Sequence, residues 1–159
     1  MSDPIVKITD DMREIIRRAI LCFVATVNPD GTPNLSPKAS LTTRGDALLF
    51  ANIASPDTVR NLRHNPGMEV NVVDVFARRG YRFAGPATVL GESDLEFHEV
   101  AAWVKATNGE VYPVFDVVRL VPSRALELRS PAYTIGHAEE TTLVKTYRTK
   151  YAAMLTKAW

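Results

Sequence analysis

Short apolar runs separated by strong turn signals dominate this chain and direct it toward a fold rich in antiparallel strands. The run NPDG at residues 28–31 joins an almost wholly apolar stretch at 20–27 to a return strand at 34–42. Proline presets one φ and glycine supplies a positive one, as a tight turn requires. The run RGD at 44–46 leads into a third strand at 47–51. Because these strands follow each other through short turns, we expect an antiparallel meander.

Helices are predicted between and beside these strands. Met12, Ile15, Ile16 and Ala19 share one helical face, and Ser55 before Pro56 and Asp57 is typical of a capped helix start. Further signals predict strands at 68–76, 81–90, 115–121 and 124–128, a helix after a capping box at Ser93, and a tail helix ending at Leu155. This order lacks repeated strand–helix–strand units and disfavours a parallel sheet. It predicts a mainly β (α+β) fold, a partly closed antiparallel barrel of about six to seven strands with flanking helices.

Two residues refine this picture. Pro37 has no N–H to donate to a ladder, so its strand should lie at an edge or a bulge. Cys22 is the only cysteine, which excludes an intrachain disulfide, and its apolar neighbours indicate a buried small hydrophobic side chain.

Length and charge limit the function classes. The 159 residues suit one domain, which we place at 1–130, with a tail at 131–159 whose helix packs on the same domain or on a dimer partner. A formal charge of +1 argues against nucleic acid as the main partner. The start lacks a signal-peptide pattern and no apolar run approaches the ~20 residues of a membrane span, so we expect a cytoplasmic protein with no membrane contact.

The sequence contains no convincing catalytic constellation. It has no glycine-rich phosphate loop and no serine elbow, and His64, His98 and His137 lack the spacing of metal ligands. We therefore assign no residue a catalytic role, and we expect no metal ion. Any chemistry should therefore be carried by a bound cofactor.

Two stretches resemble the pyridoxamine 5′-phosphate oxidase-like family of FMN-binding split barrels. The first is GTPNLSPK at 31–38, which leads to FANIAS at 50–55, and the second is FARRGYRFAG at 76–85. The likeness extends over residues 10–130, including the order of strands and helices. It implies a split β-barrel and a homodimer that holds FMN at the subunit junction.

The resemblance also implies which residues contact the cofactor. They come from the second strand, the end of the third, the following helix start, and a later strand that reaches the partner's site: Ser36, Pro37, Lys38, Ala39, Ser40, Phe50, Ala51, Asn52, Ser55, Thr58, Arg79, Tyr81 and Arg82. Alternation alone places Ser36, Lys38 and Ser40 on one strand face, which suits an anion or a polar cofactor edge, although without the resemblance a solvated outer face is the more ordinary interpretation. Helix capping would by itself explain a serine at position 55, although the N-terminus of a helix also attracts phosphate.

The chain departs from the oxidase itself. Where the oxidase pattern has arginine and lysine, this chain has Ser36, Leu41, Pro56 and Asp57. Its C-terminal substrate motif is also missing, so pyridoxamine phosphate is a poor candidate substrate. Compensating charge for the phosphate should come from Lys38, Arg79 or Arg82, unless these arginines are solvated or paired with Glu69 or Asp74.

Four functions stay open on the sequence. The first is an FMN-dependent oxidoreductase acting on an unidentified small molecule, and the second is a flavin-binding sensor or carrier without turnover. The third keeps the barrel but binds a deazaflavin coenzyme or haem, although no histidine lies on the cofactor strands. The fourth is a dimeric structural domain with an empty cleft.

Overall fold

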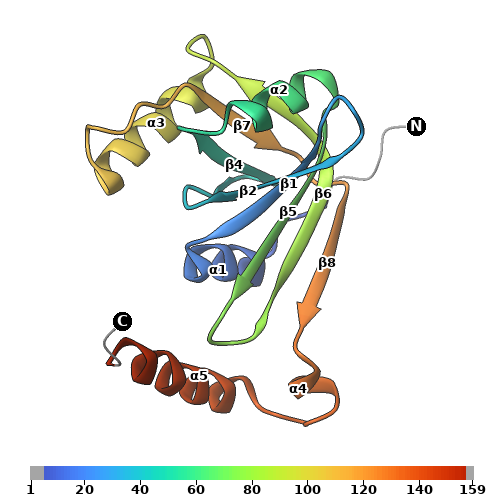
Figure 1. The fold of residues 1–159 in the computed structure, drawn as a ribbon, viewed down its shortest axis with the longest axis vertical. Coiled ribbons are helices and arrows are strands. Elements are labelled where there is room, and N and C mark those ends of the chain that lie inside the picture. Colours follow the sequence, from blue (N-terminus) through green and yellow to red (C-terminus); the bar gives the residue numbers. More distant parts are fainter. Residues whose placement is uncertain (1–5, 157–159) are drawn as a thin grey trace.

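The structure, a computed structural model, describes residues 6–156 and shows one antiparallel barrel with helices around it (Figure 1). Its elements are α1 (Asp10–Ala19), β1 (Cys22–Val27), β2 (Pro33–Lys38), β3 (Thr42–Arg44), β4 (Ala47–Asn52), α2 (Pro56–His64), β5 (Gly67–Asp74), β6 (Arg79–Leu90), α3 (Leu95–Asn108), β7 (Asp116–Leu120), β8 (Arg124–Arg129), α4 (Pro131–Thr134) and α5 (Glu140–Leu155). The predicted fold class is confirmed.

A short connection between its two edge strands closes the sheet. The strand order is β2-β1-β5-β6-β7-β4-β3, with β8 paired to β6. A flat path of this length would separate β2 from β3 by roughly 29 Å. Yet only residues 39–41 join them, and the step from Lys38 to Thr42 can span at most roughly 14 Å. The sheet must therefore curve until its edges meet, which makes it a barrel.

The same connection corrects two expectations. The single strand predicted at 34–42 is two strands, β2 and β3, so the sheet has eight strands rather than six or seven. The predicted meander forms only in part, because β1 pairs with β2 and β3 with β4, while the other neighbour of β4 is β7 and not β2. At the break, the Ser40 hydroxyl accepts a hydrogen bond from Ala51 N at 3.0 Å and donates to Ala51 O at 3.4 Å. This side chain replaces ladder bonds that residues 39–41 do not make.

Two other local expectations differ from the structure. The stretch 20–27 is not a buried strand throughout, because Ile20 and Leu21 form an exposed turn and β1 begins at Cys22. From there Cys22 and Val24 face the core while Phe23 faces outward. The capping box at Ser93 does not form, since Asp94 is the N-cap of α3 and its carboxylate accepts from Gly91 N instead.

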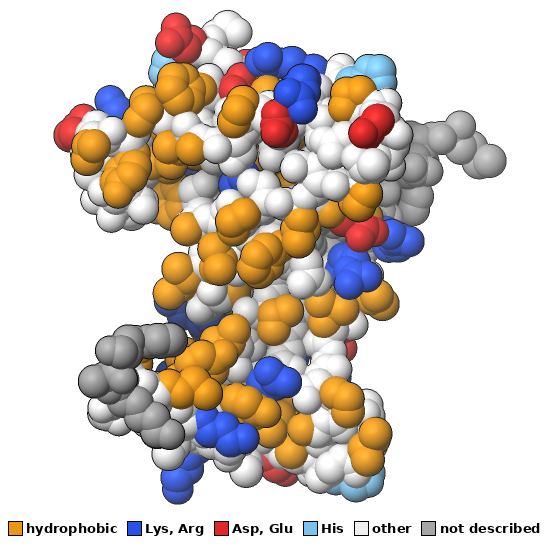
Figure 2. All heavy atoms as spheres, in the orientation of Figure 1, with side chains coloured by type: hydrophobic (Ala, Val, Ile, Leu, Met, Phe, Trp, Pro, Cys, Tyr) orange, Lys and Arg blue, Asp and Glu red, His pale blue; other side chains and the backbone are white. Residues whose placement is uncertain are grey.

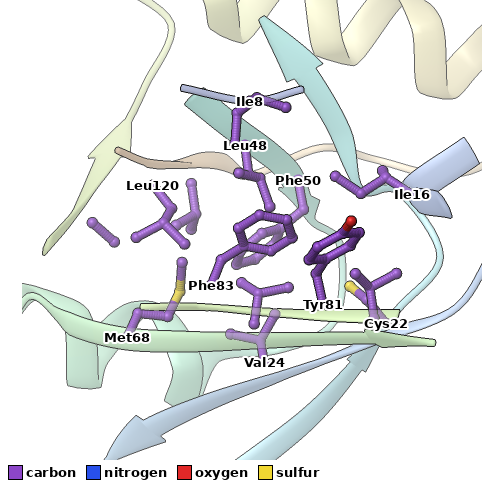
Figure 3. Close-up of a cluster of buried hydrophobic side chains, with 14 of the residues drawn as sticks. Ile8, Ile16, Cys22, Val24, Leu48, Phe50, Met68, Tyr81, Phe83 and Leu120 are labelled. Carbon is purple, nitrogen blue, oxygen red and sulfur yellow. The ribbon is translucent and has the colours of Figure 1, made fainter. Parts of the chain in front are cut away.

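The barrel interior is filled by large apolar side chains that converge from α1 and from opposite walls (Figure 3). Phe50 and Phe83 lie at its centre and are almost completely buried. Cys22 is buried as expected, and burial raises the pKa of its thiol to about 12. A second cluster lies between α3 and the other face of β4 and β7, so all six residues of β4 are buried.

The tail extends away from the barrel and touches it near the tip of the β5–β6 hairpin (Figure 1). Glu140 accepts from Arg79 at 2.6 Å, and Tyr151 meets the edge of Phe76 with ring centres 5.5 Å apart. Leu143 is the one buried residue among the described residues of α5. A role for this tail in packing on a dimer partner stays a prediction. No helix within residues 6–156 has both the length and the apolar character that crossing a membrane requires.

Gly80, on β6, gives a test of the close packing between β6 and β5. A Cβ at Gly80 would lie 2.0 Å from the carbonyl oxygen of Val72, whereas a Cβ at Gly91 would meet nothing within 4 Å. We expect Gly80→Ala to lower the free energy of unfolding by about 3 kcal/mol or more, and Gly91→Ala to change it by less than about 0.5 kcal/mol. Urea unfolding of both variants measures this difference. Equal stabilities would contradict the packing described here.

Candidate functional site

Lys38, the last residue of β2, places a cation inside the protein, and no carboxylate of residues 6–156 pairs with it. The side chain is only 6% exposed. Its ammonium donates to Ser36 Oγ at 2.5 Å, to Ser55 Oγ at 2.7 Å and to Pro37 O at 3.3 Å. The ammonium also lies 5.7 Å from the centre of the Phe50 ring. Every partner is neutral, so the hydrogen bonds are made while the charge stays unbalanced.

The local sequence explains how these groups meet. Ser36 and Lys38 are two residues apart on β2 and project to the same side. Ser55 follows β4 and precedes α2, yet its side chain makes no capping hydrogen bond. Its hydroxyl lies 3.1 Å from Ser36 Oγ and accepts from Lys38. The interpretation of Ser55 as a simple helix cap is therefore wrong, because the lysine takes its hydroxyl.

Burial has an electrostatic consequence for Lys38. Removal from water disfavours the charged amine and lowers its pKa from the ordinary value. Hydroxyl groups offset only part of that desolvation, since a buried charge is normally stabilised by an opposite charge. An anion arriving at this point would therefore be attracted by the cation and by two serine hydroxyls that can donate to it.

A cleft of about 190 Å³ opens beside Lys38. Its walls come from the connection after β2, the end of β4 and the last turns of α3: Pro37, Lys38, Ala39, Ser40, Ala51, Ile53, Ala54, Ser55, Val104 and Asn108. Ligand sites commonly measure roughly 300–1,000 Å³. One chain thus encloses only part of a molecule the size of a flavin.

The structure brings most of the predicted second- and third-strand residues to this place. Phe50 lies under the ammonium, and Asn52 fixes the turn by accepting from Ser55 N at 3.0 Å and donating to Asp116 at 3.0 Å. Thr58 is buried on α2, and its hydroxyl has no hydrogen-bond partner among the described residues.

The three predicted residues of β6 lie elsewhere in the chain. Arg79 forms two hydrogen bonds to Asp11, at 2.8 and 2.9 Å, besides its bond to Glu140. Tyr81 donates to the same Asp11 at 2.5 Å. The guanidinium and the phenol together lower the pKa of Asp11 to about 2, while burial and the carboxylate raise the pKa of Tyr81 to about 12. Arg82 is half-exposed and lies 3.9 Å from Glu69. Within one chain these residues do not join the Lys38 cluster.

Sequence reasoning missed part of the cleft. Val104 and Asn108 close it from α3, and Ile53 and Ala54 line its floor. The helical spacing of α3 marks Val104 as inward-facing, but nothing in the sequence says which strand it faces. Asp11 was also missed as the partner of Arg79, because the two lie 68 positions apart.

The histidines lie outside this cleft. His64 and His137 are exposed, and His98 contacts the carbonyl oxygen of Glu92 at 2.7 Å. Among residues 6–156, no three His, Cys, Asp or Glu side chains come together in the way that a metal ion requires.

Comparison of the sequence with protein families finds one match. The family described as Pyridoxamine 5′-phosphate oxidase matches residues 8–130, the whole barrel. No curated protein matches the chain in sequence.

Solved structures share this fold. HupZ of Group A Streptococcus is 27% identical, with a TM-score of 0.68 over 77% of this chain and 94% of its own. An FMN-binding protein from Syntrophomonas wolfei is 16% identical, with a TM-score of 0.67 over 75% of this chain and 84% of its own. HutZ, the heme storage protein from Vibrio cholerae, is 19% identical, with a TM-score of 0.61 over 76% and 94%. The last two show similarity of fold alone.

The uncompensated charge of Lys38 predicts a measurable effect in the ligand-free protein. Lys38→Met keeps the length of the side chain and removes the charge, so we expect it to raise the free energy of unfolding at pH 7 by about 1 kcal/mol. The folded pKa of Lys38 lies below its unfolded value, so the wild-type protein gains stability as pH rises through that folded value. The advantage of the variant should therefore shrink toward pH 10. Urea unfolding across this range measures it, and a destabilised variant at pH 7 would contradict the electrostatic description.

Proposed function

Because the chain belongs to the pyridoxamine 5′-phosphate oxidase family, we propose that it is an FMN-binding oxidoreductase acting on an unidentified small molecule. The observation that carries this proposal is the buried ammonium of Lys38, whose partners among the described residues are two serine hydroxyls and a carbonyl oxygen, all of them neutral. FMN supplies a phosphate dianion, which would balance this charge, and a pyrimidine edge whose carbonyl oxygens would accept hydrogen bonds from the ammonium. When bound, the flavin supplies hydride transfer at N5.

Ser36, Lys38 and Ser55 are the residues that would hold the anionic part of the cofactor. Their oxygen and nitrogen atoms lie within 3.1 Å of one another, so a single acceptor group can contact all three. The lysine orients the anion and keeps its charge balanced, while the hydroxyls reorient to donate. Ala39 and Ala51 leave room beside them, since neither side chain extends beyond Cβ.

The start of α2 is a weaker place for the phosphate. Pro56 removes one of the N–H groups that a helix N-terminus offers. Asp57 adds a negative charge there, although Arg60 holds it at 2.7 Å on the exposed side of the helix. These two residues favour Lys38 over the helix terminus as the anchor for the phosphate.

The proposal includes a homodimer with FMN at the subunit junction. A cleft of about 190 Å³ needs further walls to enclose a flavin, and a second copy would supply them. Of the three β6 candidates, Arg79 already faces two carboxylates in its own chain. Arg82 is half-exposed with one distant partner, so it is the better candidate to reach the partner's cofactor.

The rival functions use the same cleft. A flavin-binding sensor or carrier would share every contact named above, so only turnover separates it from an oxidoreductase. A deazaflavin coenzyme would need a similar anion site. Haem storage is described for HutZ, but here the three histidines lie away from the cleft of the described chain. Location in the cytoplasm stays a prediction.

Replacing Lys38 tests the cofactor site directly. Lys38→Met should weaken FMN binding roughly 10- to 150-fold, because a charge-assisted hydrogen bond contributes about 1.5–3 kcal/mol. Lys105→Met is the matched control, since that ammonium is exposed on α3 and lies 3.7 Å from Glu110. Fluorescence titration with FMN measures both affinities.

The stability of each variant without ligand shows whether a loss of FMN binding reflects unfolding. Lys38→Met should fold at least as well as the wild type, so a loss of affinity cannot come from unfolding. If Lys38→Met binds FMN as tightly as the wild type, the proposed phosphate site at Lys38 is wrong, and the arginines of β6 become the candidates.

Anaerobic reduction separates the enzyme from the sensor. We expect NADH or NADPH to reduce the bound flavin and a small electrophile to reoxidise it, because hydride transfer is the chemistry that the cofactor supplies. Stopped-flow absorbance of the FMN-loaded protein follows both steps. Flavin that stays oxidised with both donors would support a sensor or carrier and count against the oxidoreductase.

A further inference from the structure

A second group of buried polar side chains joins β2 to α2, away from the Lys38 cleft. Asn61, on α2, is completely buried. Its amide nitrogen donates to Thr26 Oγ1 at 3.1 Å and to Asn28 Oδ1 at 2.8 Å. The amide nitrogen of Asn34, on β2, donates to the same Thr26 oxygen at 3.0 Å. The Thr26 hydroxyl therefore accepts two hydrogen bonds and links the strand to the helix. We call this path from Asn34 through Thr26 to Asn61 the amide bridge.

The amide bridge runs beside the contact between Ser36 and Ser55. On β2, Asn34 and Ser36 occupy alternate positions and face the same side. On the other side, Asn61 follows Ser55 by less than two helical turns, roughly 9 Å along the axis. The two serine hydroxyl oxygens lie 3.1 Å apart. The same strand and the same helix are thus joined twice, once by the amide bridge and once at the Lys38 site.

The serine contact depends on the offset between β2 and α2. β2 is the end strand in the sheet order, and it pairs with β1 alone. Pro33 and Pro37 bring no N–H to that ladder, so β2 has fewer backbone bonds than an ordinary strand of its length. Apolar packing tolerates small sliding movements, whereas a hydrogen bond accepts only a narrow range of distances and angles. The amide bridge is therefore the directional link that fixes this offset.

Stability alone does not explain an amide at position 61. A buried polar atom that lacks a hydrogen bond lowers the stability of the folded chain. Asn61 Oδ1 is buried and has no hydrogen-bond partner among the described residues, and the same holds for Thr58 Oγ1 on the same helix. A leucine of similar volume would avoid that cost. Buried polar groups of this kind can instead specify one geometry among several that apolar contacts would allow.

We propose that Asn61 and Thr26 are positioning residues of the Lys38 site. They fix the offset between β2 and α2 and so hold the Ser55 hydroxyl 2.7 Å from the Lys38 ammonium. Neither residue is among those that line the Lys38 cleft, so both act through Ser55. The consequence for FMN rests on the proposed function, whereas the effect on Ser55 does not. When the amide bridge is broken, Ser55 moves away from Lys38 and a bound anion loses a donor.

Thr26→Val removes the shared acceptor and keeps the shape of the side chain. We expect this variant to bind FMN roughly tenfold more weakly, since a hydrogen bond to a charged group contributes about that factor. Thr26→Ser retains the hydroxyl and should restore the FMN affinity to within about twofold of the wild type. Fluorescence titration with FMN measures both.

Ile15→Val is the matched control for a general loss of stability. It removes one methylene group from a completely buried side chain of α1, and it should leave the FMN affinity unchanged. FMN affinity in Thr26→Val equal to that of the wild type would overturn the positioning role. An equal loss of affinity in Ile15→Val would overturn it as well.

A double-mutant cycle with Asn61→Leu and Ser55→Ala shows whether Asn61 acts through Ser55. Each single variant should bind FMN roughly tenfold more weakly than the wild type. Because both changes remove the same donor, the double variant should lie within about twofold of Ser55→Ala. Independent effects would multiply to roughly a hundredfold, and that result would contradict the proposal.

Urea unfolding of the same four proteins without ligand keeps this inference apart from the proposed function. Ser55→Ala removes a hydrogen-bond acceptor from Lys38, so it should lower the unfolding midpoint of the wild type. In the Asn61→Leu background the loss should be less than about half as large, since Ser55 has already moved. Equal losses in both backgrounds would overturn the positioning role even in a protein that binds FMN. The expected coupling in a protein that takes up no FMN would support the role and defeat the flavin function.

Discussion

The short connection at residues 39–41 is the constraint on which the fold and the site both depend. It joins the two edges of the sheet and forces the barrel to close. Closure carries Lys38, at the end of β2, to Ser55, at the end of β4, so that an ammonium and two hydroxyls meet. The same segment lines the Lys38 cleft through Ala39 and Ser40. A longer loop would leave these groups free to separate.

The Lys38 cleft contains a residue that lowers the stability of the chain by itself. Lys38 is a buried cation, and none of its partners among the described residues is an anion. The surrounding core keeps it in place: Phe50 and Phe83 pack inside the barrel (Figure 3), and the α3 cluster packs on the other face of β4. The view in Figure 2 shows apolar side chains on the hollowed waist between barrel and tail, a surface that a second copy could cover.

The sequence predicts local structure better than it predicts pairing. Turn residues at 28–31 and the spacing of Ile15 and Ile16 were enough to place α1 and the first hairpin. The pairing of β4 with β7 was missed, because no local signal records which distant strand a buried segment meets. Ser36 and Lys38 could be placed on one face by alternation, but their link to Ser55 depends on barrel closure. Likewise, no local sequence pattern predicts that Arg79 donates hydrogen bonds to Asp11 and Glu140.

The content of FMN in the purified protein tests the central claim most directly. The protein is saturated with FMN, freed of excess by gel filtration, and then denatured so that the released flavin can be measured against the protein in the eluted peak. Two equivalent sites between two subunits predict one FMN for each chain in a peak of dimeric mass. A protein that elutes without flavin after saturation would contradict the account.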